Sequence, residues 1–366
     1  MGCCNEPVGT LTGAPPDPSQ HVNYARGMVL GVDDFTQEFA YLSGRDRWLA
    51  REAIGYGTLS GLRIVAENDG SDGPRIRVGA GSALTPGGQL VCVTADQCCV
   101  INKWLAKAAN AAIVTGLLNP TSPTLSPPMS PPASPPAVKS GLVPLQLVLC
   151  YRDCQTRDVP IPGEPCRSDD ALMAPSRIAD DFALELRAAA PLQTEEDAVR
   201  DFAAWLRANI TFAGTSPPAG GDEAAWLHAL RLAAQPWLAA QNLSPPASPP
   251  VSFSSLGDYL FNISPGIELA PSEATAFMRM ALRFWVTELR PMWMACRCQR
   301  AQCSDADCVL LAGIEFDAVW VGGSPSGAWQ IDGSPAAIVV DESRRPVLAH
   351  LRLLQELQLI GAGVAP

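Results

Sequence analysis

Two proline-rich tracts divide the chain and limit how much of it can fold as one continuous piece. Residues 119–136 read NPTSPTLSPPMSPPASPP, and the last seven of them, SPPASPP, recur at 244–250. Proline supplies no backbone N–H and favours extended polyproline II, so neither tract can belong to a helix interior or a central strand. We interpret 119–138 as a linker or surface loop and 244–250 as an insertion into another loop. A docking site for a proline-recognising partner is the alternative.

Outside these tracts the composition is that of a folded protein. The 366 residues are enough for two or three cores of ordinary size, and 47% of them are hydrophobic against 17% charged, which excludes disorder of the whole chain. The net charge of −11 offers no basic surface to a phosphate backbone, so we expect no nucleic-acid partner. No apolar run reaches the roughly 18 to 20 residues that a membrane span needs.

The hydrophobic pattern predicts an α+β fold that opens with a helix and a small antiparallel β module. Asp33 and Asp34 can cap the helix, and its far side carries Arg45 and Arg47, which we interpret as solvated or as part of an interface. Mixed strands, an inserted helical region and proline-rich surface loops complete the expected fold. The apolar positions of the first helix, which we expect to face a core, are Phe35, Phe39, Leu42, Leu49 and Ala53.

Local patterns predict the remaining elements. The segment 156–175 contains four prolines and is predicted to be a loop. Strands are predicted at 59–66, 75–78, 82–84, 89–93, 144–152 and within 309–340, and helices at 194–209, 222–240, 272–289 and 346–360. The expected organisation is a tail (1–21), the helix and β module (22–118), the proline-rich loop (119–138), a strand and loop region (139–190), the helical region (191–290) and a cysteine-rich segment with strands and a last helix (291–366).

The cysteines are the main candidates for chemistry. The N-terminus has neither a cationic n-region nor an apolar h-region, so we expect cytoplasmic synthesis without a signal peptide, where disulfides are rare. Cys296, Cys298, Cys303 and Cys308 fall within thirteen residues and can form a closed four-sulfur site, for which structural zinc is the usual occupant. Disulfides and unpaired thiols are the alternatives. Under oxidising conditions a Cys154–Cys166 bridge is favoured.

Few residues indicate catalysis, and we expect no enzyme. The three histidines, His21, His228 and His350, are far apart in sequence, and no hydrolase, metalloprotease or nucleotide-binding motif occurs. Glu315 and Asp317 share one strand face, which is more typical of a solvated edge than of acid–base machinery.

Two stretches and a C-terminal part carry a resemblance to a known family. The first stretch is Val32-Asp33-Asp34-Phe35…Glu38…Tyr41…Arg45-x-Arg47…Arg51…Gly55-x-Gly57…Gly61-Leu62-Arg63-Ile64, continued by Ile76-x-Val78…Gly81-x-Ala83-Leu84…Gly87-Gly88. The second is Pro162-Gly163-Glu164-Pro165-Cys166-Arg167-Ser168-Asp169-Asp170…Met173-Ala174-Pro175-Ser176-Arg177-Ile178…Phe182-x-Leu184-Glu185-Leu186. With Cys296-Arg297-Cys298…Cys303 and Arg344-Arg345-Pro346…Leu353-Leu354-Gln355-Glu356, they resemble an uncharacterised family of bacterial proteins encoded near genes of phage-tail-like contractile injection systems.

The resemblance implies a structural component of a contractile particle, at the baseplate or fibre level. Its partners would be other subunits, with homo-oligomeric contacts among them, and it would be released as part of an extracellular particle. Arg167, Asp169 and Arg177 are our candidates for an inter-subunit loop, and a loop whose charges touch nothing is the alternative. A standalone cysteine-rich surface or adhesion protein, and a metal-dependent hydrolase using Asp305 or Asp307 beside the cysteines, are the other functions considered.

Overall fold

The computed structural model divides the chain into two compact units. Unit 1 comprises residues 1–191 and 305–366, and unit 2 comprises residues 192–304. The structure describes residues 16–68, 73–119, 138–160, 173–191, 193–212, 226–227, 230, 267–290, 307–322, 327–331 and 337–361. Helices and antiparallel sheets make unit 1 an α+β fold in which an N-terminal helix precedes small sheets, as the sequence predicts.

The first part of unit 1 contains two small antiparallel sheets. The strand predicted at 59–66 is in fact two strands, because Gly61 and Leu62 adopt positive φ angles of 62° and 55° and turn the chain between them. One sheet has the order β1-β4-β5, from Gly57–Gly61, Gly81–Leu84 and Leu90–Val93. The other has the order β2-β3-β6, from Ile64–Asn68, Pro74–Val78 and Gln97–Val100.

Two helices that the sequence analysis missed follow these sheets. They are α2, Ile101–Leu105, and α3, Ala108–Leu118. Helix α3 is apolar almost all round, so it lacks the polar face on which a periodicity argument depends. The two helices contribute Ile101, Leu105 and Val114 to the core.

The largest sheet has five strands. Strands β7 (Ser140–Pro160) and β8 (Met173–Arg187) pair in register, so the prediction of a loop over 156–175 was wrong at both of its ends. Pro160 and Pro175, the prolines of the predicted loop that these strands contain, fall at the outer end of a two-stranded ribbon, where a missing N–H interrupts no central ladder. The order is β12-β11-β7-β8, with β11 at Cys308–Val321, β12 at Ala328–Ile331, and β13 at Val339–Asp341 pairing with β11.

One hydrophobic core joins all these elements of unit 1. Buried side chains of both small sheets, of α2 and α3 and of the large sheet form a single cluster, from Leu62 through Phe316 to Ile338. Within it Trp329 packs edge-on against Trp320, and its indole N–H donates to the Thr115 hydroxyl oxygen at 2.9 Å. The regions 62–118, 139–190 and 307–341 therefore share one core.

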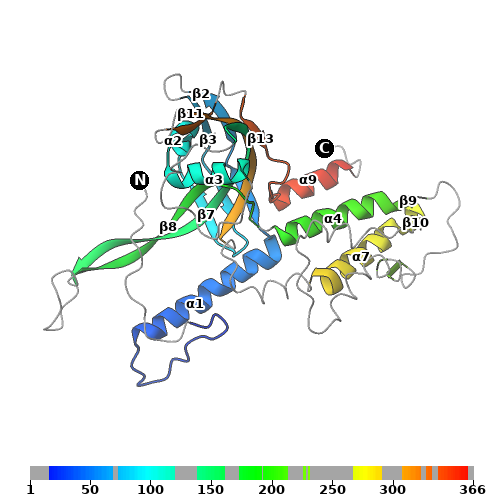
Figure 1. The fold of residues 1–366 in the computed structure, drawn as a ribbon. Coiled ribbons are helices and arrows are strands. Elements are labelled where there is room, and N and C mark those ends of the chain that lie inside the picture. The colour runs from blue at the N-terminus through cyan, green and yellow to red at the C-terminus, as the bar shows by residue number, and fades with distance from the viewer. Residues whose placement is uncertain are drawn as a thin grey trace, which may run out of the picture. The chain divides into compact units, whose positions relative to one another are not determined.

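Beyond this core, β7 and β8 continue as a two-stranded ribbon. Strand β11 pairs with β7 only as far as Cys150, whereas β7 and β8 remain paired to Pro160 and Met173. We call residues 151–160 and 173–182 the arm. In Figure 1 the green strands of the arm run on past the other strands of unit 1.

Unit 2 is built mainly from helices. The predicted helix 194–209 is confirmed as α4, Thr194–Asn209, and the one at 272–289 is found as α7, Ala274–Phe284, with a short 3-10 turn before it (η3, Pro271–Glu273) and a π-helical turn after it (η4, Trp285–Leu289). The predicted helix 222–240 lies mostly outside the described residues. Strands β9, Ile210–Phe212, and β10, Ile267–Leu269, pair in parallel. The core of unit 2 includes Phe202 stacked on Trp285, with ring centroids 5.1 Å apart.

No helix in the described part of the chain is both long and apolar enough to cross a membrane. The last helix, α9, spans Leu351–Gly361 and begins five residues later than the predicted start at Pro346. The delay has a local cause, because Val347 forms a parallel bridge with Thr58 instead.

Candidate interaction surfaces

The first helix presents its apolar side chains to solvent. Helix α1 spans Val32–Leu49 and continues as a π-helical turn, η1, at Ala50–Ile54, and neither contains a buried residue. Phe35, Phe39, Leu42 and Leu49 are between 54% and 69% exposed. The prediction that these residues and Ala53 face a core was wrong, because no described part of unit 1 packs on that side of the helix. Helical periodicity showed which side is apolar, but the side that faces the core depends on tertiary packing.

The segment before α1, residues 16–31, covers the side of α1 opposite its apolar side. In this segment, the N-terminal tail (residues 16–31), the ring of His21 lies 5.0 Å from that of Tyr41, centroid to centroid. The Gln37 amide nitrogen donates to the Asp17 carbonyl at 2.6 Å, and Pro18 lies against Gly44. The tail thus steadies the ridge formed by Gln37, Tyr41 and Gly44 and leaves the apolar side open.

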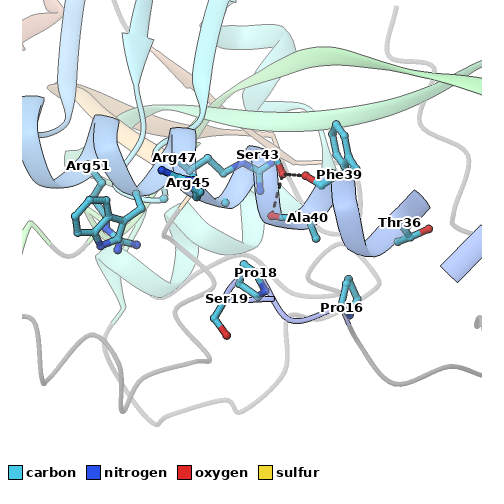
Figure 2. A pocket seen from close by; sticks show the side chains of 13 residues that line it. Pro16, Pro18, Ser19, Thr36, Phe39, Ala40, Ser43, Arg45, Arg47 and Arg51 are labelled. Carbon is cyan, nitrogen blue, oxygen red and sulfur yellow. Dashed lines mark hydrogen bonds between the residues drawn. The ribbon is translucent and has the colours of Figure 1, made fainter. Parts of the chain in front are cut away.

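A cavity of about 640 Å³ lies between the tail and α1. Figure 2 shows Pro16, Pro18 and Ser19 of the tail across from the helix, and Ser43 donating to the Phe39 carbonyl at 2.7 Å. Its lining combines guanidinium groups with aromatic rings, a composition enriched in protein interfaces. The side chains that give it this character are Phe39, Arg47, Trp48 and Arg51.

The two arginines proposed as interface residues of α1 lie in different settings. Arg45 is exposed and folds back along the helix, with its guanidinium carbon 5.5 Å from the centroid of the Tyr41 ring. Its Nη1 donates to the Tyr41 hydroxyl at 3.1 Å. Arg47 is half-buried in the wall of the cavity. Both are within reach of a partner, and their role at an interface stays a prediction.

The arm is the second exposed surface. Arg177 lies exposed on β8, and its Nη1 donates to the Ser176 carbonyl at 2.8 Å. Across the ribbon, Arg157 has a φ of 59°, a conformation unusual for a residue with a side chain, and its carbonyl accepts from the Ser176 hydroxyl at 2.7 Å. The other two proposed loop residues, Arg167 and Asp169, lie outside the described residues.

A tyrosine joins the two strands at the base of the arm. The Tyr151 hydroxyl lies 2.5 Å from Asp153 Oδ1 and 2.6 Å from Asp180 Oδ1, and these two aspartates are opposite each other in the register. Burial, together with these two carboxylates, raises the pKa of Tyr151 far above its ordinary value. The phenol therefore stays protonated, and its O–H donates a hydrogen bond to the acidic pair.

A disulfide closes the ladder where β11 ends. Cys150 and Cys308 are opposite each other in the β7–β11 register, and their sulfur atoms are bonded. Both are buried, and Arg187 Nη2 donates to them at 3.3 and 3.4 Å. Because Cys308 is bonded to Cys150 in this structure, it supplies no thiolate to the predicted zinc site. Its other proposed ligands, Cys296, Cys298 and Cys303, lie outside the described residues, as does Cys166, so zinc and the Cys154–Cys166 bridge stay predictions.

Other thiols and acidic groups show no metal-binding arrangement in the described ranges, where no group of three or more potential ligands gathers. Cys98 and Cys99 line a cavity of about 790 Å³ beside Lys107, and burial raises the pKa of the Cys99 thiol. A thiol of raised pKa remains protonated at neutral pH, which disfavours it as a nucleophile or a metal ligand.

The candidate catalytic residues lie on separate elements. His21 lies against Tyr41 of α1, the Nδ1 of His350 accepts from the Arg352 amide at 3.1 Å, and Glu315 and Asp317 lie on β11. The Asp307 carbonyl accepts from the Tyr151 amide, while His228 and Asp305 lie outside the described residues. Among those described, none shares a hydrogen bond or an ion pair with another.

The chain that follows α1 is anchored by a buried arginine that the sequence analysis did not single out. Arg345 Nε donates to the Thr58 hydroxyl at 2.8 Å, its Nη1 donates to the Leu62 carbonyl at 3.0 Å, and it pairs with Glu342. Gly57 has a φ of 141°, and a Cβ there would lie 2.6 Å from the Pro346 carbonyl oxygen. We call these contacts the junction. They bring together the segments 57–62 and 342–346, which are far apart in sequence.

The spacing of the exposed residues of α1 contains a further signal. Intervals of three and four residues alternate strictly from Val32 to Leu49, which is the heptad pattern of a helix that packs along another helix. We call this set the α1 seam, and it consists of Val32, Phe35, Phe39, Leu42, Asp46 and Leu49. The heptad count could have found Val32 and Asp46 from the sequence alone.

Comparison with known proteins gives no family assignment. No protein-family model matches the chain, and no curated protein is significantly similar to it.

Proposed function

We propose that this chain is a structural component of a phage-tail-like contractile injection particle, associated with its baseplate or fibres, and that it acts through protein–protein interfaces. The observation that carries the proposal is the exposed apolar side of α1. Contiguous apolar surface on a folded protein marks an interaction site, because removing apolar surface from water is favourable in free energy. The choice of particle rests on the sequence resemblance, which includes residues of α1, the arm and the junction.

The arm supports the same proposal. A two-stranded ribbon is at best marginally stable alone in water, and no third strand pairs with the arm in the described structure. Its exposed apolar side chains include Val159, Met173 and Ile178. A neighbouring subunit that packs on the ribbon would bury these side chains and stabilise it.

Native purification of the untagged protein from its own cells tests the proposal directly. Size, negative-stain images and co-purifying proteins are to be recorded on the same sample. The expected result is recovery within a large sheathed particle. Recovery only as a small free species would overturn it.

A single substitution in the arm tests whether the interfaces matter. Arg177→Ala removes an exposed guanidinium that, in the described structure, donates to the neighbouring Ser176 carbonyl, so the isolated fold should be unchanged. We expect the yield of assembled particles to fall. Arg279→Ala, which removes an exposed arginine of α7 in unit 2, is the matched control and should leave the yield intact. A normal yield from Arg177→Ala would remove the arm from the interface.

The disulfide favours a second candidate, a standalone cysteine-rich surface or adhesion protein. Cys150 and Cys308 are bonded, and such bonds persist in oxidising surroundings. This candidate predicts that the secreted chain is found free in the medium with the bond formed, as non-reducing electrophoresis would show. Finding the oxidised chain only within particles would rule it out.

A further inference from the structure

We infer that α1 pairs with the α1 of a second copy of this chain, in antiparallel orientation, through the α1 seam. The inference rests on the proposed function, since it names one partner of the same surface. It starts from the seam itself, whose apolar members are all more than half exposed and recur with coiled-coil spacing.

The N-terminal tail leaves the seam accessible. The tail holds the ridge of Gln37, Tyr41 and Gly44, which lies on the opposite side of the helix from Phe39 and Leu42 at 3.6 residues per turn. The cavity of Figure 2 lies on one flank of the seam. The tail also reaches the edge of the seam at Glu38, whose Oε2 accepts from the Val22 amide at 3.0 Å. A second helix can approach Phe39 and Leu42 without displacing the tail.

The charge within the seam selects the orientation. Asp46 occupies a position at which, in a parallel pair, each residue faces its own copy, so two carboxylates would meet in an apolar interface. In an antiparallel pair this position lies beside an apolar residue of the other copy, and the carboxylate can turn to the edge of the interface. A polar group in the seam weakens a pair but restricts its geometry.

The flanking charges point the same way. With Phe39 of one helix packed beside Leu42 of the other in antiparallel alignment, Glu38 of each copy comes close to Arg45 of the other. The ends of the helix are also complementary, since Asp33 and Asp34 lie in its first turn and Arg47 in its last. An antiparallel pair sets acidic ends against basic ends, whereas a parallel pair sets like charges side by side.

The area available fits a weak, specific pair. The five apolar side chains of the seam each expose on the order of 100 Å², which amounts to about 1,000 Å² for two copies and lies near the lower bound for a specific interface. An isologous contact of this kind uses the same residues on both copies, as two-fold symmetry requires. It would join two chains and leave both arms available to other subunits.

The experiment is sedimentation equilibrium of the full-length chain over a dilution series. We expect a monomer–dimer equilibrium whose dissociation constant rises at least tenfold in Leu42→Glu. Leu282→Glu makes the same change at an exposed leucine of α7 in unit 2 and should leave the constant unchanged. A wild-type chain that stays monomeric throughout, or a Leu42→Glu variant that dimerises normally, would overturn the inference.

A charge exchange tests the orientation separately. Arg45→Glu should weaken the dimer by placing Glu38 of one copy beside a carboxylate of the other. Adding Glu38→Arg should restore the dimer, and Glu38→Gln alone serves as the control for changing the residue that accepts from the Val22 amide of the tail. Because a parallel pair does not bring these residues together, failure of the rescue in a chain whose circular dichroism is unchanged would overturn the antiparallel arrangement.

The proposed function and this inference can fail independently. A chain found in particles but monomeric when pure keeps the function and loses the α1 pair. A chain that dimerises through α1 but is never recovered with particles keeps the pair and loses the function.

Discussion

Helix α1 and the junction differ in how their side chains find partners. The guanidinium of Arg345 is buried, and it bonds to Thr58, Leu62 and Glu342 of its own chain. Helix α1, in contrast, carries large apolar side chains and buries none of them. The core of unit 1 is formed within one chain, whereas we propose that α1 is covered by another. The experiments below test that contrast, beginning with the substitutions expected to lower the free energy of unfolding most.

The disulfide should contribute most to the stability of the interior. Cys150 and Cys308 are separated by 158 residues, so the bond restricts a very long loop in the unfolded chain. Replacing both cysteines with alanine is expected to lower the free energy of unfolding by about 3 to 5 kcal/mol. Urea denaturation of the variant and of the oxidised wild type provides the measurement. Reducing the wild type should reproduce the loss, and equal midpoints for all three samples would contradict it.

Arg345→Met should be the next largest change. The methionine fills part of the same space but leaves the Thr58 hydroxyl and the Leu62 carbonyl without their donor, at a cost of about 3 kcal/mol. Thermal unfolding with matched denaturant titration measures the loss. Arg344→Met, at the adjacent exposed position, is the control. If both variants unfold alike, Arg345 does not hold the junction together.

Glu185→Gln should have a smaller effect that depends on pH. Burial would raise the pKa of Glu185, but hydrogen bonds from Arg152 and Arg187 outweigh it and hold the pKa below its ordinary value of 4.5. The carboxylate therefore stabilises the fold above that value, and the contribution is lost as the pH falls through the lowered pKa. With allowance for partial exposure, we expect the variant to lose about 1 kcal/mol at neutral pH.

The difference between variant and wild type should shrink in acid. Denaturant titrations at neutral pH and below the folded-state pKa provide the comparison. A difference that stays constant with pH would mean that the charge of Glu185 contributes nothing and that only its shape matters.

Leu42→Ala should lower the free energy of unfolding least, and it compares α1 with the core directly. With the chain diluted until it is monomeric, this change on α1 should alter the free energy of unfolding by less than about 0.5 kcal/mol. The same change at Leu311, which is fully buried in β11, should cost about 3 kcal/mol. Similar losses at the two sites would show that α1 packs within its own chain after all.

The sequence predicted elements well where local chemistry determines them. The helix 194–209 and the short strands at 75–78 and 82–84 have clear caps, turns or alternation, and the structure contains them. Helix α3 was missed because it is apolar all round, and the arm was missed because its prolines resemble those of a loop. Both depend on packing or pairing with residues distant in sequence.

The candidate surfaces were predicted only in part. Arg45, Arg47 and Arg177 were identified from charge and resemblance, and the structure leaves all three accessible or lining a cavity. The apolar side of α1 was assigned to a core, because periodicity shows that a helix has an apolar face but not what covers that face. The junction could not be predicted, since Arg345 and Thr58 are 287 residues apart.

The bond between Cys150 and Cys308 also determines what a protease could do to this protein. All of unit 2 and the whole arm lie between these two cysteines in the chain. A single cut anywhere in that stretch would yield two pieces that stay covalently attached and migrate with the mass of the intact chain until a reductant separates them. The protein could therefore be nicked at its exposed parts and still remain one molecule, with its core and its junction in place.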